Sequence, residues 1–148
     1  MHSPQPDLPM PFQALRAHLA PVQDLKMAAA VLEWDQETFM PEGGATARAH
    51  QVATLRRLAH EAFTSPDTAR LLAEAERAAD GLDPHSDEAA LVRVVRRDFD
   101  KATRLPSRLI SELAEASALA KEAWKSAREA SRFATFAPHL ERLVALNR

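Results

Sequence analysis

The chain has 148 residues, of which 46% are hydrophobic and 27% are charged, and its formal net charge is −2. This length and composition are typical of one globular domain with its own core, and the weak negative charge argues against non-specific nucleic-acid binding. The absence of cysteine excludes disulfides, thiolate nucleophiles, and zinc or iron–sulfur sites with cysteine ligands.

The start of the chain has no features of a targeting or membrane segment. Residues 1–11 are rich in proline and lack both the basic start and the apolar run of a signal peptide, so we expect a flexible tail there. No apolar stretch reaches the length that a membrane span needs. We therefore expect a cytoplasmic protein that has no membrane partner.

Apolar residues recur at helical spacing from Phe12 onward, which predicts one helical domain over residues 12–148. Pro21 should either kink one long first helix or start a second one. Further helices are expected at about residues 45–63 and 66–79, after the capping segment 83–88, after 105–106, and at 138–147. No segment alternates as a strand does, so the fold class is an all-α bundle of about six amphipathic helices.

The most distinctive stretch is residues 32–44, where a tryptophan, four carboxylates, a phenylalanine and a methionine precede the only Gly-Gly pair. Pro41 disfavours a helical conformation at Met40, and the two glycines permit backbone angles that other residues avoid, so the chain must turn here. Trp34 and Phe39 are expected to be buried anchors of this corner. Helical spacing likewise assigns Val94 and Trp124 to the buried faces of their helices.

Glu33, Asp35 and Glu37 surround Trp34 and raise the hypothesis of an acid–base cluster. Residues two apart on a helix point to different sides, however, so these carboxylates should not converge. We expect Asp35 to bind backbone amides at the corner or to pair with an arginine such as Arg48, and the other two carboxylates to be solvated.

Several segments, taken together, resemble the N-terminal region of the carboxypeptidase Taq family of metallocarboxypeptidases. They are residues 31–41, 47–49, 58–61, 63–66, 97–106 and 133–141, in the same order as in the family. By this resemblance the corner carries family-motif residues with a structural role: Trp34, Asp35, Glu37, Thr38, Met40, Pro41, Gly44 and Arg48.

The resemblance implies an all-helical fold and a specific activity for longer relatives. Family members remove single residues from the C-termini of peptides, using zinc or cobalt held by a His-Glu-x-x-His helix and a later glutamate. Those ligands belong to the portion that would follow Arg148. The resemblance therefore implies no catalytic residue, no metal ligand and no cofactor in this chain.

The histidines offer only near matches to metal motifs. His60-Glu61 begins like the zinc motif, but Thr64 stands where the second histidine is needed. His85 lies in a capping segment. A small metalloenzyme that uses His50, His60 and nearby acids is a third hypothesis, which requires the fold to gather distant residues.

A basic stripe runs along one predicted helix through Arg93, Arg97, Lys101 and Arg104. Interspersed acids favour a solvated face with salt bridges over a phosphate or nucleic-acid site. The residues that we predict to face a groove or a partner are Arg97, Asp98, Arg104 and His139.

These observations favour an N-terminal helical module of a carboxypeptidase Taq-like enzyme, either a fragment or a naturally short relative, that is inactive alone. In the family these helices cover the groove that leads to the metal and help to admit the C-terminal end of a peptide. The alternative is a stand-alone interaction or regulatory bundle. Such a bundle would form a homo-oligomer, first of all a dimer, or bind a full-length family member.

Overall fold

The computed structural model describes residues 9–41 and 43–148, and these contain six α-helices, one 3-10 turn and no strand. The helices are α1 (Met10–Thr38), α2 (Ala45–Phe63), α3 (Pro66–Ala79), α4 (Asp87–Ala102), α5 (Ser107–Glu129) and α6 (Ala137–Leu146), and the turn is η1 (Phe133–Thr135). The predicted all-α fold is therefore confirmed. None of these helices is both long enough and apolar enough to cross a membrane.

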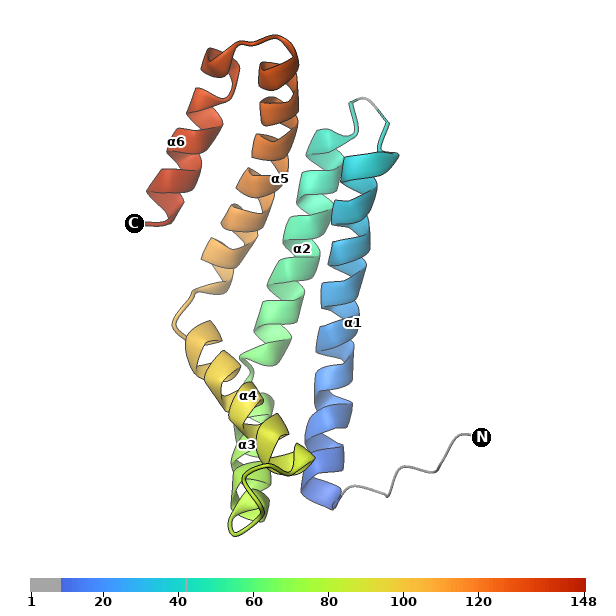
Figure 1. The fold of residues 1–148 in the computed structure, drawn as a ribbon, viewed down its shortest axis with the longest axis vertical. Helices are drawn as coiled ribbons and strands as arrows, with labels where there is room; N and C mark the ends of the chain where they lie inside the picture. The colour runs from blue at the N-terminus through green and yellow to red at the C-terminus, as the bar shows by residue number, and fades with distance from the viewer. Residues whose placement is uncertain (1–8, 42) are drawn as a thin grey trace.

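The helices form an elongated bundle (Figure 1). α1 runs along most of its length, and α2 returns beside it. α3 and α4 lie together at one end, and α5 leads from α4 along α2 to the other end, where α6 folds back against α5. We call these parts the α3–α4 end, which includes the first half of α1 and the end of α2, and the α5–α6 end, which includes the rest.

The helix boundaries follow local signals in the sequence. α3 begins after Ser65, whose hydroxyl accepts a hydrogen bond from the backbone N–H of Thr68. α4 begins in the same way after Ser86, with the N–H of Ala89 as donor. Gly81, just beyond α3, has a φ of +80°, in the left-handed region that favours glycine. These starts and this stop lie where the sequence predicts them.

The first helix differs from expectation at its start. It begins at Met10 with Pro11 in its first turn, so the predicted tail of residues 1–11 extends two residues too far, and its residues 1–8 lie outside the described residues. A proline is tolerated there because its missing N–H has no partner in the first turn. Pro21 lies inside α1, which continues to Thr38 as one long helix.

The α3–α4 end holds the main hydrophobic core. Large side chains from four helices bury almost all of their surface there: Phe12, Leu15, Val22, Phe63, Leu72, Val92, Val95 and Phe99. The prediction that Val94 is buried is wrong, because Val92, Val95 and Phe99 form the inner face of α4 and leave Val94 outside.

Small residues form most of the packing surface at the α5–α6 end. The buried hydrophobic positions there are Ala29, Ala49, Val52, Ala53, Ala116, Ala118, Ala120 and Ala127. Alanine faces allow α2 and α5 to approach closely, and such a face leaves no room for an indole. The prediction that Trp124 is buried is accordingly wrong, since its side chain is exposed.

Candidate functional site

The backbone of the corner between α1 and α2 turns where the sequence predicts. The N–H of Met40 donates to the carbonyl of Asp35, which closes the end of α1. Gly43 has a φ of +85°, and a Cβ on Gly44 would lie 3.1 Å from the carbonyl oxygen of Pro41. The turn therefore depends on both glycines.

Trp34 and Phe39 are exposed, so the prediction that they are buried anchors is wrong. Their exposed fractions are 60% and 75%, and their rings meet edge to face with centroids 5.9 Å apart. The buried residues Val22, Ala29 and Gln36 recur at every seventh position of α1. Trp34 precedes Gln36 by two residues, which is about 200° around the helix, so it points away from the bundle.

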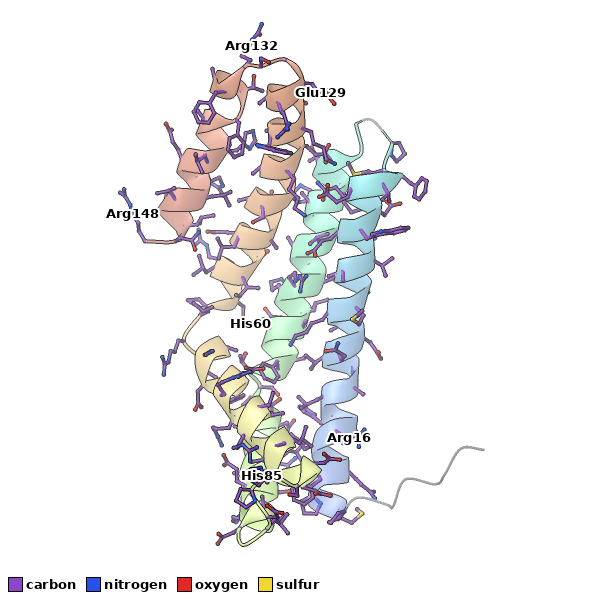
Figure 2. The ribbon with its side chains drawn as sticks, viewed as in Figure 1. Arg16, His60, His85, Glu129, Arg132 and Arg148 are labelled. Carbon is purple, nitrogen blue, oxygen red and sulfur yellow. The ribbon has the colours of Figure 1, made fainter. Side chains whose placement is uncertain are left out.

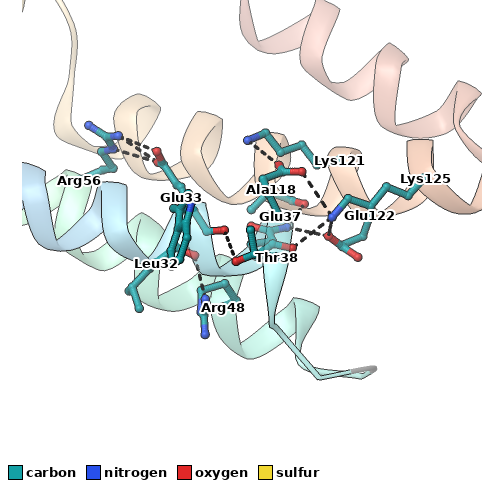
Figure 3. Close-up of polar contacts among 12 residues, drawn as sticks. Leu32, Glu33, Glu37, Thr38, Arg48, Arg56, Ala118, Lys121, Glu122 and Lys125 are labelled. Atoms are coloured by element: carbon teal, nitrogen blue, oxygen red, sulfur yellow. Dashed lines mark hydrogen bonds and ion pairs between the residues drawn. The ribbon is translucent and has the colours of Figure 1, made fainter.

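Gln36 is a buried polar residue at this corner that the sequence analysis missed. Its Nε2 donates to the carbonyl of Ala118 at 2.9 Å and to Oε1 of Glu122 at 3.2 Å. The Nζ of Lys125 donates in turn to the backbone carbonyl of Gln36 (Figure 3). These bonds tie the end of α1 to α5. The seven-residue spacing of the buried positions in α1 is the signal that could have located this side chain.

Asp35 is paired with Arg48, which is one of the two arrangements that the sequence predicted for it. The Nη1 of Arg48 lies 2.6 Å from Oδ2 of Asp35 and also donates to the carbonyl of Leu32 at 2.7 Å. The hydroxyl of Thr38 donates to the carbonyl of Trp34 one turn earlier. The two bonds of Arg48 join the end of α1 to the start of α2, which supports a structural role for Asp35 and Arg48.

Glu33 and Glu37 are partly exposed, as expected for solvated carboxylates, and each also has a basic partner (Figure 3). The Nη2 of Arg56 lies 3.0 Å from each oxygen of Glu33. The Nζ of Lys121 lies 3.1 Å from Glu37, and its hydrogen bond holds the pKa of the Glu37 carboxyl below its usual value. Each of Glu33, Asp35 and Glu37 thus binds a different basic residue, and the three do not form an acid–base cluster.

The histidines named in the metalloenzyme hypothesis point to different elements. The Nε2 of His60 is hydrogen-bonded to the carbonyl of Leu105 at 2.8 Å, and the Nδ1 of His50 lies 3.7 Å from Glu115. Over residues 9–41 and 43–148, no three His, Asp or Glu side chains are grouped so that they could hold a metal ion.

A groove runs beside α2, facing the junction of α4 and α5. It consists of a larger hollow of about 460 Å³ and a smaller one of about 270 Å³, which share Arg56 and Ile110. Figure 2 labels His60 where α2 faces this junction, and His60 lines the larger hollow. We call these two connected hollows the α2 groove.

Of the four residues predicted to face a groove or a partner, only Asp98 lines the α2 groove. Arg97 binds this carboxylate, since its Nη2 lies 3.1 Å from Oδ1 of Asp98. Arg104, in the connection after α4, and His139, on α6, line neither hollow. A partner contact by these residues stays a prediction.

Exposed apolar side chains gather on α1. Met27, Val31 and Trp34 follow one another at four- and three-residue spacing, with Phe39 against Trp34, and each is at least half exposed. Side chains at this spacing share one helix face. We call these four residues the α1 stripe.

Comparisons with known proteins give a consistent result. Residues 14–148 match the family model described as carboxypeptidase Taq (M32) metallopeptidase. The chain is 36% identical to thermostable carboxypeptidase 1 of Thermus thermophilus over 137 residues, which cover 93% of this chain and 26% of that protein. It is 32% identical to thermostable carboxypeptidase 1 of Pyrococcus furiosus over 120 residues, which cover 80% of this chain and 23% of that protein. The chain thus spans about a quarter of the length of these relatives.

Solved structures show the same helical arrangement. The BsuCP crystal structure aligns with a TM-score of 0.86 at 23% identity, over 94% of this chain and 28% of that chain, which is a likeness of fold. The Pyrococcus furiosus carboxypeptidase structure (Apo-Mg) aligns with a TM-score of 0.66 at 29% identity, over 96% of this chain and 28% of that chain. Because the family model matches residues 14–148, which are nearly the whole of this chain, the chain belongs to the carboxypeptidase Taq (M32) metallopeptidase family.

Proposed function

We propose that this chain acts as the N-terminal helical module of a carboxypeptidase Taq-like metallocarboxypeptidase and is catalytically inactive by itself. In such an enzyme the module covers the groove that leads to the metal and helps to admit the C-terminal end of a peptide. One observation carries the proposal: the family model matches residues 14–148, while the chain spans about a quarter of its relatives.

The α1 stripe supports a role as part of a larger body. Its aromatic members Trp34 and Phe39 expose more than half of their surface to water in this chain. Contiguous exposed apolar side chains are uncommon on a monomer unless another surface covers them. The remaining portion of a parent carboxypeptidase would supply that surface.

The test is an assay of the purified chain on benzyloxycarbonyl-Ala-Arg with added zinc or cobalt, alongside metal analysis. We expect no hydrolysis and no stoichiometric metal. A chimaera of the Thermus thermophilus enzyme in which residues 14–148 of this chain replace the matching region should hydrolyse the same substrate. Hydrolysis by the chain alone in proportion to bound metal would contradict the proposal.

The alternative is a stand-alone interaction protein that self-associates, first of all as a dimer, or that binds a full-length family member. The α1 stripe favours it as well, because a second copy could cover the same side chains. Light scattering of the pure chain addresses self-association, and a monodisperse monomer at high concentration would count against it. Binding to the intact Thermus thermophilus enzyme addresses the other partner.

A further inference from the structure

The larger hollow of the α2 groove combines an apolar floor with a cationic rim. Ala59 and Phe63 of α2 lie in its floor, while Lys26 of α1 and Lys101 of α4 line its rim. Its volume of about 460 Å³ is in the size range of sites that hold small molecules. Three helices thus bring two ammonium groups to one apolar hollow.

Both carboxylates that line the groove are already paired with arginines. Asp98, in the larger hollow, is bound by Arg97. Glu33, in the smaller hollow, receives hydrogen bonds from Arg56 on both carboxylate oxygens. Neither carboxylate is therefore left to compensate a lysine of the rim.

The two lysines, by contrast, have no carboxylate partner among residues 9–41 and 43–148. The Nζ of Lys26 lies 5.0 Å from the centroid of the Phe63 ring, a cation–π contact that holds the ammonium over the floor. Lys101 is exposed and lines the same hollow. The rim therefore carries positive charge beside an aromatic surface.

We propose that this hollow binds small amphiphilic carboxylates, that is, molecules with one carboxylate and an apolar body. The carboxylate pairs with Lys26 and Lys101, and the apolar body covers Phe63 and Ala59. Such a group exists in a free aromatic or branched acid and in the apolar C-terminal residue of a peptide. The proposal concerns the groove alone and does not depend on whether the chain covers an active site.

The lining favours this ligand over a phosphate. A phosphate dianion needs several donors around its oxygens, but Arg56 of the lining is bound to Glu33 and the Nε2 of His60 to the carbonyl of Leu105, so only the two lysines remain. A monocarboxylate leaves its apolar body to be buried against the same floor, which adds to binding in proportion to the area removed from water. The hollow thus matches both parts of an amphiphilic carboxylate.

The experiment is an NMR titration of the ¹⁵N-labelled chain. The ligands are N-acetylphenylalanine, N-acetyl-alanyl-phenylalanine, the neutral N-acetylphenylalaninamide, acetate and inorganic phosphate. We expect both acids with a phenyl ring to shift amides near Ala59–Phe63 and Lys101. Loss of the charge-assisted hydrogen bonds should make the neutral amide bind about tenfold more weakly. Acetate and phosphate should bind still more weakly. Tighter binding of N-acetylphenylalanine would identify the ligand as a free acid, and tighter binding of N-acetyl-alanyl-phenylalanine would identify it as the C-terminal residue of a peptide.

Variants test the lysines directly. Lys26→Met and Lys101→Met should each weaken the binding of N-acetylphenylalanine about tenfold, because each removes one charged donor. Arg70→Met removes an equal charge from the exposed face of α3, outside the groove, and should leave the affinity unchanged. Circular dichroism checks that all three variants fold. Equal affinity for acid and amide, unchanged affinity in both lysine variants, phosphate binding as tight as that of the acid, or shifts confined to other helices would overturn the proposal.

Discussion

The two ends of the bundle are stabilised by different kinds of contact. At the α3–α4 end, aromatic and branched side chains such as Phe12 and Leu72 are fully buried in one cluster. At the α5–α6 end, the helices meet through alanines, and polar bonds such as those of Gln36 and Arg48 connect α1 to α5 and to α2. Hydrophobic burial therefore acts mainly at one end, while close packing and polar bonds hold the other.

The two surfaces differ in their aromatic residues: Phe12, Phe63 and Phe99 of the α3–α4 end are buried, although Met10, Leu82 and Val94 are exposed there. The large apolar side chains of the α5–α6 end lie mostly outside, and they include Val31, Trp34, Phe39, Trp124, Phe133 and Val144. The free energy available from their burial is not used within this chain. An end that keeps its aromatic residues on the surface is suited to dock against a further body, which agrees with the proposed role of the chain as a module.

The largest expected effect is at the α3–α4 end. Leu72→Ala should lower the free energy of unfolding by about 3 kcal/mol, because it removes a fully buried side chain and leaves a cavity. Leu140→Ala, on the partly exposed face of α6, should cost less than about 1 kcal/mol. Urea unfolding measures both. Equal losses would show that the two ends contribute alike to stability.

A smaller effect is expected from the polar bonds of the other end. Gln36→Ala should cost about 1–2 kcal/mol, because it removes a buried side chain that donates to Ala118 and Glu122. Gln23→Ala, at an exposed position of the same helix, serves as the control and should be nearly neutral. If both variants unfold at the same urea concentration as the parent, the bonds of Gln36 do not hold α1 to α5.

The pH dependence of stability should reveal one ion pair at each end. Hydrogen bonds from Lys121 and Arg96 hold the pKa values of the Glu37 and Glu76 carboxyls below the usual 4.5. As the pH falls, these carboxyls are therefore protonated in the unfolded chain before they are protonated in the folded one. The stabilisation from each ion pair is complete above the usual pKa and is lost as the pH falls through the lowered pKa of the folded state. Glu76→Gln and Glu37→Gln should each flatten the fall in unfolding free energy below about pH 5. Unfolding titrations at several pH values measure this, and unchanged slopes in both variants would contradict it.

The fold was predictable where its signals are local. The starts of α3 and α4 follow from Ser65 and Ser86, whose hydroxyls cap the helix that comes next. The corner follows from Pro41 and the two glycines, and the short turn explains why Asp35 and Arg48 could be paired from the sequence. Each of these inferences needs only neighbouring residues.

The burial of side chains, the long-range ion pairs and the groove could not be predicted in this way, because they depend on which face of each helix turns inward. The position of Trp34 at the corner suggested that it is buried, whereas the buried register of α1 runs through Val22, Ala29 and Gln36. The pairing of Glu37 with Lys121 joins residues more than 80 positions apart, and no local pattern indicates it. The α2 groove likewise arises only when α1, α2, α4 and α5 are packed together.

The smallest effect on stability is expected at the α1 stripe, where it would be most informative. Trp34→Ser should change the free energy of unfolding by less than about 0.5 kcal/mol, because the indole contacts mainly solvent and Phe39. The same substitution should weaken any self-association, or binding to a full-length relative, because it removes the largest side chain of the stripe. Gln23→Ser on the same helix should change neither quantity. A loss of about 2 kcal/mol in Trp34→Ser, measured by urea unfolding, would instead make Trp34 an internal anchor and remove the distinction between the two ends.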